Sequence, residues 1–256
     1  MKKMNIKRFT IKGHDGYEMA AELDLPEKGY PKYFCIYVPC FTCTKNIRVL
    51  KHISKQLVSK GIALLRFDFP GIGNSEGEFS ETTYSTNLKN IRLAAKWLEE
   101  NYEAPKLGIG HSMGGSAMMK FAKEYDPMEI LVTIAAPSKP DHLCRVLERN
   151  VKEAEETGSS KRIIGGIEFT LTKDFFDDLT TNSKDYDLSK LRKPILVLHS
   201  PDDDTVSLDE ARKILAQVRG HRSYVMLNNY GHLIMDEEKA IKTADIIYNW
   251  AKMYLE

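Results

Sequence analysis

The sequence predicts an α/β protein with a mostly parallel central sheet and helices on both faces. From Val38 onward, short apolar segments of strand length alternate with segments whose apolar residues recur every three or four positions. A repeated strand-then-helix order is typical of a parallel sheet that is covered on both sides. The chain has 256 residues, enough for one large domain, so we expect a single domain over residues 1–256.

Two further strands are expected before the alternation begins. The turn Gly13–Gly16 lies between these two strands and predicts that they form an antiparallel hairpin. The expected strands lie at Phe9–Ile11, Glu18–Leu25, Tyr33–Val38, Ile62–Phe67, Lys106–Ile109, Ile130–Ala135, Pro194–Leu198 and Ser223–Leu227. Apolar residues at helical spacing predict helices at Ile47–Leu57, Tyr84–Leu98 and Ala240–Tyr254. Ser207 and Glu210 predict a capping box at the start of a further helix.

One segment, the insertion at about residues 140–192, interrupts the alternation. It is longer than a simple connection and mixes charged residues with apolar clusters. Long connections are usually functional or disordered. Residues 151–160 look exposed, whereas residues 163–169 and the pair Phe175 and Phe176 look half-buried. These apolar residues favour an ordered cap over the active-site edge of the sheet.

The charge balance excludes some classes of partner. There are 37 basic and 36 acidic residues, a formal net charge of +1, which gives no electrostatic reason to expect nucleic acid or an anionic membrane. The basic start of the chain has no apolar h-region behind it, so we expect no signal peptide. No apolar run is long enough to span a bilayer. Four cysteines do not make a disulfide framework at this size, and a cytoplasmic location is expected.

The most informative motif is Gly110–Gly114, with the form G-x-S-x-G. An apolar strand precedes it and a segment of small residues that can begin a helix follows it, which is the context of a nucleophile elbow. So tight a turn favours glycine at both flanking positions. The following helix N-terminus favours developing negative charge. Ser112 is therefore the predicted nucleophile.

A serine hydroxyl needs a base to take its proton, and the base is expected to be a histidine. The histidines after Ser112 are His142, His199, His221 and His232. His232 is favoured because its loop lies between the last strand and the last helix, from which it can reach the elbow. His199 is expected to be packed and hydrogen-bonded, and His221 to be solvated. His142, at the start of the insertion, is an outside candidate.

The acid that orients the base is expected after the strand that ends at Leu198 and His199. The loop there carries Asp202, Asp203 and Asp204 in a row, and its position alone does not choose among them. The acid holds the imidazole in one tautomer and stabilises the imidazolium.

An oxyanion hole needs two backbone N–H donors. The residue after the nucleophile, Met113, is expected to supply one, and Phe41 in the loop that follows Val38 is expected to supply the other. A backbone donor leaves no side-chain signature, so this prediction rests on position.

Two further patterns are expected to be structural. Gly71 and Gly73 follow a strand, but the third glycine of a dinucleotide motif is missing and no helix begins there, so a turn is favoured. Cys40 and Cys43 are a lone pair without two further ligands at metal spacing, so no zinc site is expected. No metal or organic cofactor is predicted.

These motifs together resemble the α/β-hydrolase superfamily over almost the whole chain. They are R-F-D-F-x-G-x-G-x-S from Arg66, G-H-S-M-G-G from Gly110, L-H-S-P-x-D-x-x-V from Leu198 and G-H-L from Gly231. Details such as C-F-T-C at Cys40 are similar to one branch, the hydrolase domain that some bacteria fuse to an OsmC-like domain. That branch is related to esterases of the feruloyl and cinnamoyl type.

The resemblance implies Ser112 as nucleophile, His232 as base and Asp203 as acid, since the H-x-x-x-D-x-x-V spacing selects Asp203. It also maps Phe41 and Met113 onto the oxyanion hole. Two departures stand out. The family usually has His or His-Gly where this chain has Pro39 and Cys40. We also expect no OsmC-like domain after Glu256, so a peroxide-related role is expected to need a separate protein.

The expected function is a serine hydrolase that cleaves carboxylic esters of small or aromatic acyl groups through an acyl-enzyme. Phe169, Phe175 and Phe176 are expected to line the acyl pocket. The expected partner is a small-molecule ester, and a homodimer is possible. A thioesterase or acyltransferase would use the same residues. A protein that only binds, with an unused triad, is a more remote alternative.

The pair Cys40 and Cys43 leaves a separate class open, a thiol redox protein. Because these cysteines bracket Phe41, we also consider an oxidative off-switch in which a disulfide draws the Phe41 N–H away from the oxyanion. The simpler alternative is that Cys40 is a small residue where Gly often stands and that Cys43 is a packed hydrophobic residue.

Overall fold

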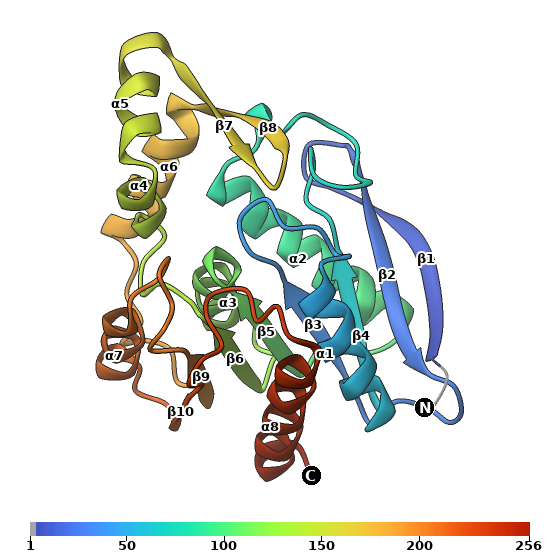
Figure 1. Ribbon diagram of the computed structural model, residues 1–256. Coiled ribbons are helices and arrows are strands. Elements are labelled where there is room, and N and C mark those ends of the chain that lie inside the picture. The colour runs from blue at the N-terminus through green and yellow to red at the C-terminus, as the bar shows by residue number, and fades with distance from the viewer. Residues whose placement is uncertain (1–3) are drawn as a thin grey trace.

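The computed structural model describes residues 4–256, and these form one eight-stranded sheet with helices on both sides (Figure 1). The strand order is β1-β2-β4-β3-β5-β6-β9-β10. The strands are β1 (Met4–Lys12), β2 (Glu18–Pro26), β3 (Tyr33–Val38), β4 (Ile62–Phe67), β5 (Leu107–His111), β6 (Ile130–Ile134), β9 (Ile195–His199) and β10 (Arg222–Met226). Residues 1–3, part of the basic start discussed above, lie outside the described residues.

The sheet is mostly parallel, as predicted. β2 runs antiparallel to both of its neighbours, β1 and β4, and the other pairs of adjacent strands are parallel. Every residue of β3, β4, β5 and β6 is buried, which explains why their sequences are nearly continuous apolar runs. The predicted α/β class and the hairpin of β1 and β2 are confirmed.

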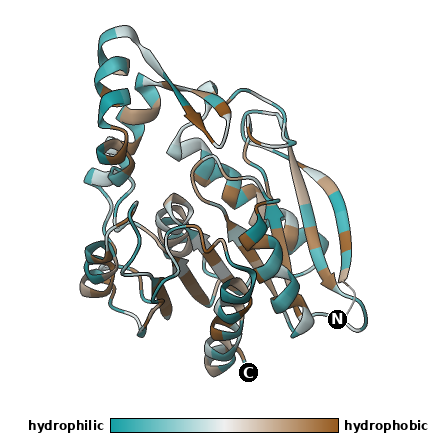
Figure 2. Ribbon diagram, viewed as in Figure 1, coloured by the Kyte–Doolittle hydropathy of each residue, from teal (hydrophilic) through white to brown (hydrophobic). Residues whose placement is uncertain are grey.

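Two hydrophobic clusters lie on opposite faces of the sheet. On one face α1 (Arg48–Ser59) packs against α8 (Glu237–Leu255), through residues such as Leu50 and Ile247. On the other face lie α2 (Tyr84–Asn101), α3 (Met113–Glu124) and α7 (Leu208–Gln217). In Figure 2 the inner strands are mostly brown, whereas α5 on the outside of the molecule is mostly teal. Burial of both faces of the sheet is the main force that holds the fold together.

The capping box predicted at Ser207 and Glu210 is wrong. Ser207 is the N-cap of α7, but its side chain makes no capping hydrogen bond. The Glu210 carboxylate instead accepts hydrogen bonds from the backbone N–H and the hydroxyl of Ser138 and pairs with Lys213. Burial raises the pKa of Glu210, but the bonds from Lys213 and Ser138 outweigh it and lower the pKa to about 2. A buried carboxylate takes the partners that satisfy it best, and one of them, Ser138, lies 72 residues away in the sequence.

The insertion (residues 140–192) forms regular secondary structure at the top of Figure 1. It contains α4 (His142–Val146), α5 (Glu148–Thr157), the hairpin of β7 (Ser159–Ile164) and β8 (Ile167–Thr172), and α6 (Lys173–Lys184). Asp178 of α6 accepts hydrogen bonds from the N–H and the hydroxyl of Ser85 in α2, which fastens the insertion to the body.

The burial pattern of the insertion differs in part from the prediction. Ile163 and Ile167, at the tip of the hairpin, are 69% and 59% exposed rather than half-buried. Phe169, Phe175 and Phe176 are almost fully buried. β8 contacts the short helix η1 (Phe79–Glu81), so the hairpin reaches back to the body of the protein.

Candidate active site

Ser112 lies in a strained turn between β5 and α3. Its φ is 54°, a left-handed value that non-glycine residues rarely adopt. A Cβ on Gly110 would lie 2.4 Å from the Gly114 carbonyl oxygen, and one on Gly114 would lie 2.2 Å from the Pro39 carbonyl oxygen. Both flanking positions therefore require glycine, and the strand, turn and helix predicted around the motif are present.

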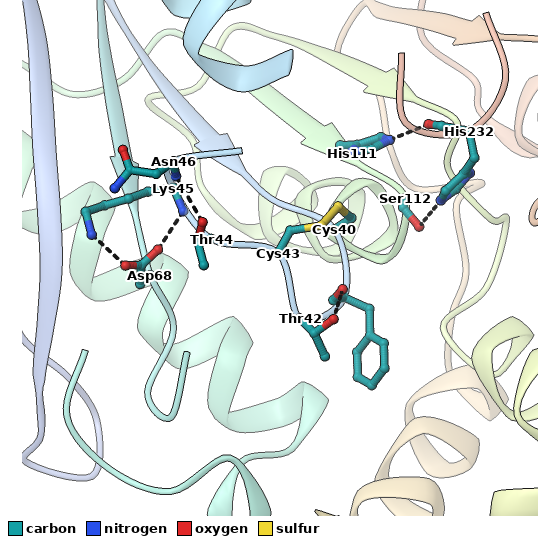
Figure 3. Close-up of a disulfide and its surroundings, with 11 residues drawn as sticks. Cys40, Thr42, Cys43, Thr44, Lys45, Asn46, Asp68, His111, Ser112 and His232 are labelled. Atoms are coloured by element: carbon teal, nitrogen blue, oxygen red, sulfur yellow. Dashed lines mark hydrogen bonds and ion pairs between the residues drawn. A yellow bond between two sulfur atoms is a disulfide. The ribbon is translucent and has the colours of Figure 1, made fainter. Parts of the chain in front are cut away.

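Ser112, His232 and Asp203 form a continuous hydrogen-bonded line. His232 Nε2 lies 3.0 Å from Ser112 Oγ (Figure 3), and His232 Nδ1 lies 2.9 Å and 3.1 Å from the two oxygens of Asp203. An ionised carboxylate only accepts, so Nδ1 carries the proton and Nε2 is left to accept one from the serine. The structure thus brings together the three residues that the resemblance selected.

Of the three adjacent aspartates, Asp203 is the one whose carboxylate lies within hydrogen-bond distance of His232. Burial raises its pKa, but hydrogen bonds from His232 and from the N–H groups of Val206 and Thr205 together hold its pKa below the usual value. Asp202 instead accepts from the Asn229 N–H at 2.6 Å, and Asp204 is exposed. The environment keeps Asp203 ionised beside the imidazole.

The other candidate histidines lie where the sequence placed them. His199 is buried, and its Nε2 lies 2.8 Å from the Val206 carbonyl oxygen. His221 is exposed, and His142 is half-buried at the start of α4. A residue without a predicted role, His111, lies beside the nucleophile with its Nε2 2.8 Å from the His232 carbonyl oxygen. Its only sequence signal is its place inside the G-x-S-x-G motif.

The loop after β3 is closed by a disulfide between Cys40 and Cys43, close to Ser112 in Figure 3. The alternative that these are two packed free thiols is therefore wrong. The Cys43 N–H also donates to the Cys40 carbonyl oxygen at 3.0 Å, which makes residues 40–43 a β-turn. Thr42, the third residue of this turn, has a φ of 61°. The disulfide and the turn hydrogen bond hold a backbone that a β-branched residue does not adopt freely.

The two backbone donors predicted for the oxyanion hole are free. Met113 is the first residue of α3, where N–H groups have no partner within the helix. Across residues 4–256, neither its N–H nor that of Phe41 donates to a protein acceptor. The disulfide-bonded loop thus leaves the Phe41 donor unengaged.

A buried ion pair, which the sequence analysis missed, anchors the far end of the same loop. The Asp68 carboxylate accepts from the backbone N–H and from the side-chain ammonium of Lys45, each at 2.5 Å (Figure 3). The Asn74 N–H donates to the same carboxylate at 3.0 Å, and a Cβ on Gly73 would lie 2.4 Å from Asp68 Oδ2. Gly73 therefore packs against this carboxylate, and a Cβ on Gly71 would lie 2.1 Å from the Phe79 backbone nitrogen, which explains both glycines without a nucleotide.

Aromatic rings link the insertion to the loop. Phe41 contacts Phe79 of η1 and Phe175 of α6, each with a centroid distance of 5.7 Å. Phe79 also contacts Phe169 at 5.0 Å, and Phe175 contacts Phe176 at 5.5 Å. The three residues predicted for the acyl pocket thus form one cluster with the residue that carries a predicted oxyanion donor. Their role in acyl binding stays a prediction.

In the part of the chain that the structure describes, no three His, Cys, Asp or Glu residues are arranged to hold a metal ion, and no helix is long and apolar enough to cross a membrane. A strained serine at the carboxyl end of a parallel strand, followed by a helix and approached by a histidine from a later loop, defines an α/β-type hydrolase.

Comparisons with known proteins agree with this class. The family profile described as serine aminopeptidase, S33, matches residues 43–147. The esterase domain of a Rhodothermus marinus protein is 32% identical, with 99% of this chain and 100% of that chain covered and a TM-score of 0.78. The chain therefore belongs to the α/β-hydrolase superfamily.

More distant relatives share the fold. Est1E from Butyrivibrio proteoclasticus, solved with ferulic acid, is 22% identical, with 94% and 98% of the two chains covered and a TM-score of 0.77. Human palmitoyl-protein thioesterase ABHD10, a mitochondrial protein, is 23% identical over 86% of this chain and 74% of its own length. The match to its bovine counterpart covers 47% of this chain and only 40% of that protein. The similarity to a branch with a fused OsmC-like domain stays a prediction.

Proposed function

We propose that the protein is a serine hydrolase that cleaves carboxylic esters through an acyl-enzyme, with Ser112 as nucleophile, His232 as base and Asp203 as acid. The observation that carries the proposal is the line of hydrogen bonds from Ser112 Oγ through the imidazole to the Asp203 carboxylate, at 3.0 Å and 2.9 Å. The similarity to an esterase domain at 32% identity supports the same reaction class.

In the first half of the reaction, Ser112 Oγ attacks the ester carbonyl carbon while His232 Nε2 takes the hydroxyl proton. The Asp203 carboxylate stabilises the resulting imidazolium. The negative oxygen accepts hydrogen bonds from the N–H groups of Phe41 and Met113. The imidazolium then protonates the leaving alkoxide oxygen as its bond to carbon breaks, which leaves the acyl group on the serine.

In the second half, water replaces the alcohol. His232 takes a proton from the water as its oxygen attacks the acyl carbon, and returns that proton to Ser112 Oγ as the serine ester breaks. The products are a carboxylic acid and the free enzyme, so no cofactor is needed for balance.

For the acyl group we propose a short aliphatic or an aromatic acid. The aromatic cluster of Phe41, Phe79, Phe169, Phe175 and Phe176 lies beside the oxyanion loop, and apolar rings favour a compact apolar group. Est1E, which was solved with an aromatic acid, supports this choice at the level of the fold.

The second candidate reaction is thioester cleavage. The observation that favours it is the alignment of 86% of the chain with a protein named palmitoyl-protein thioesterase. The same nucleophile, base and oxyanion donors would serve, because only the leaving atom changes from oxygen to sulfur.

A matched panel of nitrophenyl esters and thioesters separates the two candidates. Acyl groups of two, four and sixteen carbons and one cinnamoyl-type acid are compared by kcat/KM in the wild type and in Ser112→Ala. We expect short or aromatic oxygen esters to react fastest and Ser112→Ala to lose activity on every substrate. A preference for the sixteen-carbon thioester would favour the second candidate, and full activity in Ser112→Ala would refute both.

A further inference from the structure

Two buried histidines, His111 and His199, flank the proposed triad without belonging to it. They are the last residues of β5 and β9, at the edge of the sheet where Ser112 and Asp203 also lie. Each is 1% exposed. Neither ring hydrogen-bonds Ser112 Oγ or the imidazole of His232, so neither is placed to exchange the proton of the reaction.

Each of these rings holds the backbone of a loop that carries a triad residue. His111 Nε2 lies 2.8 Å from the carbonyl oxygen of His232, and His199 Nε2 lies 2.8 Å from that of Val206. A carbonyl oxygen only accepts, so both rings carry their proton on Nε2. His232 has the opposite tautomer, with its proton on Nδ1.

The loop that carries His232 needs such support. Asn229, Gly231 and Ile234 have φ values of 62°, 62° and 48°, and two of these three are not glycine. Left-handed backbone at such residues persists only where neighbouring groups hold it. Ser200 Oγ accepts a hydrogen bond at 3.2 Å from the N–H of Gly231, the residue before His232. The bond from His111 acts on the peptide of His232 itself.

The acid loop has the same arrangement. The N–H groups of Thr205 and Val206 donate to Asp203 Oδ1 at 2.9 Å and 2.8 Å. The Val206 carbonyl oxygen is held by His199, so the backbone of Val206 is fixed on both its N–H and its C=O side. The His199 ring also lies 3.7 Å from Asp203 Oδ2, which limits how far the carboxylate can turn.

Both rings leave Nδ1 buried and without a hydrogen-bond partner. An unpartnered buried nitrogen costs free energy, and an apolar side chain of similar size would avoid that cost. The bonds to His232 and Val206 are therefore the polar function that these rings supply. Burial and the neighbouring His232 lower the pKa of His111 to about 4, so the ring is neutral at neutral pH.

We propose that His111 and His199 are positioning residues of this hydrolase: each donates Nε2–H to the carbonyl of a triad loop, His111 to align the base and His199 to align the acid. The inference rests on the proposed function, because it assigns the role of supporting that triad. Misplacement of a catalytic group by about 1 Å costs about a hundredfold in rate. Loss of either bond is expected to lower kcat about tenfold to a hundredfold with little change in KM.

The test compares His111→Leu with His111→Gln, and His199→Leu with His199→Gln, on the best ester. Leu fills the space without a donor, whereas the Gln amide retains an N–H. We expect kcat to fall in both Leu variants and to recover largely in the Gln variants. Thr243→Val is the matched control, since it removes a buried hydroxyl that donates to a backbone carbonyl of α8, away from the site. A folded Leu variant that keeps kcat within about threefold of wild type overturns the assignment for that histidine.

A measurement on the wild type guards against Leu variants that fail to fold. Imidazole ¹⁵N NMR distinguishes protonated from unprotonated ring nitrogens, and the His111 and His199 signals are assigned by their loss in the Gln variants. We expect Nε2 to carry a proton in both rings, and the His111 ring to be neutral at about pH 7. A ring whose Nε2 carries no proton overturns the role assigned to that histidine. Activity that survives Ser112→Ala would instead refute the proposed function itself, so the two failures are distinguishable.

Discussion

Asp203→Asn is expected to reverse the tautomer of the base. In the wild type, Asp203 Oδ1 accepts the N–H groups of Thr205 and Val206, so in the variant the amide oxygen must take that position. The amide nitrogen then takes the place of Oδ2 and points its N–H at His232 Nδ1, which must accept. The proton moves to Nε2, and Nε2 can no longer take the proton of Ser112.

The size of this effect follows from that geometry. A wrong tautomer in a triad lowers kcat about 10⁴-fold, a barrier increase of roughly 5 kcal/mol. Asp202→Asn keeps a carbonyl oxygen for the Asn229 N–H, and Asp204 is exposed, so both matched variants are expected to lose less than about tenfold.

The assay is kcat on a short nitrophenyl ester for the three asparagine variants, with thermal unfolding as the control for folding. The reasoning is refuted if Asp202→Asn or Asp204→Asn is the most damaged variant. It is also refuted if folded Asp203→Asn keeps more than about a hundredth of wild-type kcat.

Three further predictions concern the surroundings of the site. Reduction by dithiothreitol, or Cys43→Ser, is expected to lower kcat by less than about tenfold, since the turn hydrogen bond remains; a rise in kcat on reduction would instead support the oxidative off-switch. Stability is expected to fall from pH 6.5 to about pH 4, because the unfolded chain protonates His111 at its ordinary pKa of 6.5 whereas the folded pKa is about 4. The unfolding free energy measured in urea is expected to fall by up to ~3 kcal/mol over this range in the wild type, and not to show this loss in His111→Gln. An equal loss in both proteins would contradict this cause. Lys45→Met leaves the Asp68 carboxylate buried without its cation, and we expect it to lower the unfolding free energy by about 3 kcal/mol. A loss below about 1 kcal/mol would show that the backbone N–H donors are sufficient to stabilise the buried carboxylate.

Sequence patterns were sufficient for the sheet, for the turn around Ser112 and for the histidine that lies beside it. The strand Tyr33–Val38 and the strand Ile62–Phe67 are found at the predicted bounds, because buried parallel strands are apolar throughout. The G-x-S-x-G motif predicted Ser112 because sterically only glycine fits beside it. His232 followed from the order of elements along the chain.

What sequence reasoning missed depends on partners that are distant in the chain. Lys45 and Asp68 are 23 residues apart, and His111 and His232 are 121 residues apart. The capping box at Ser207 failed because Ser138, 72 residues before Glu210, satisfies that carboxylate. Among three adjacent aspartates, only the resemblance selected Asp203, since the direction of each side chain is set by the folded loop.

Trapping of the acyl-enzyme tests the central claim most directly. The protein is mixed with a slowly hydrolysed aromatic nitrophenyl ester and quenched in acid, and the modified residue is located by mass spectrometry of its peptides. The account predicts one acyl group on Ser112, which accumulates in the wild type as fast as the nitrophenol burst, forms far more slowly in His232→Ala and is absent from Ser112→Ala. An acyl group on Cys144 or another residue, or turnover in Ser112→Ala with no adduct, would contradict it.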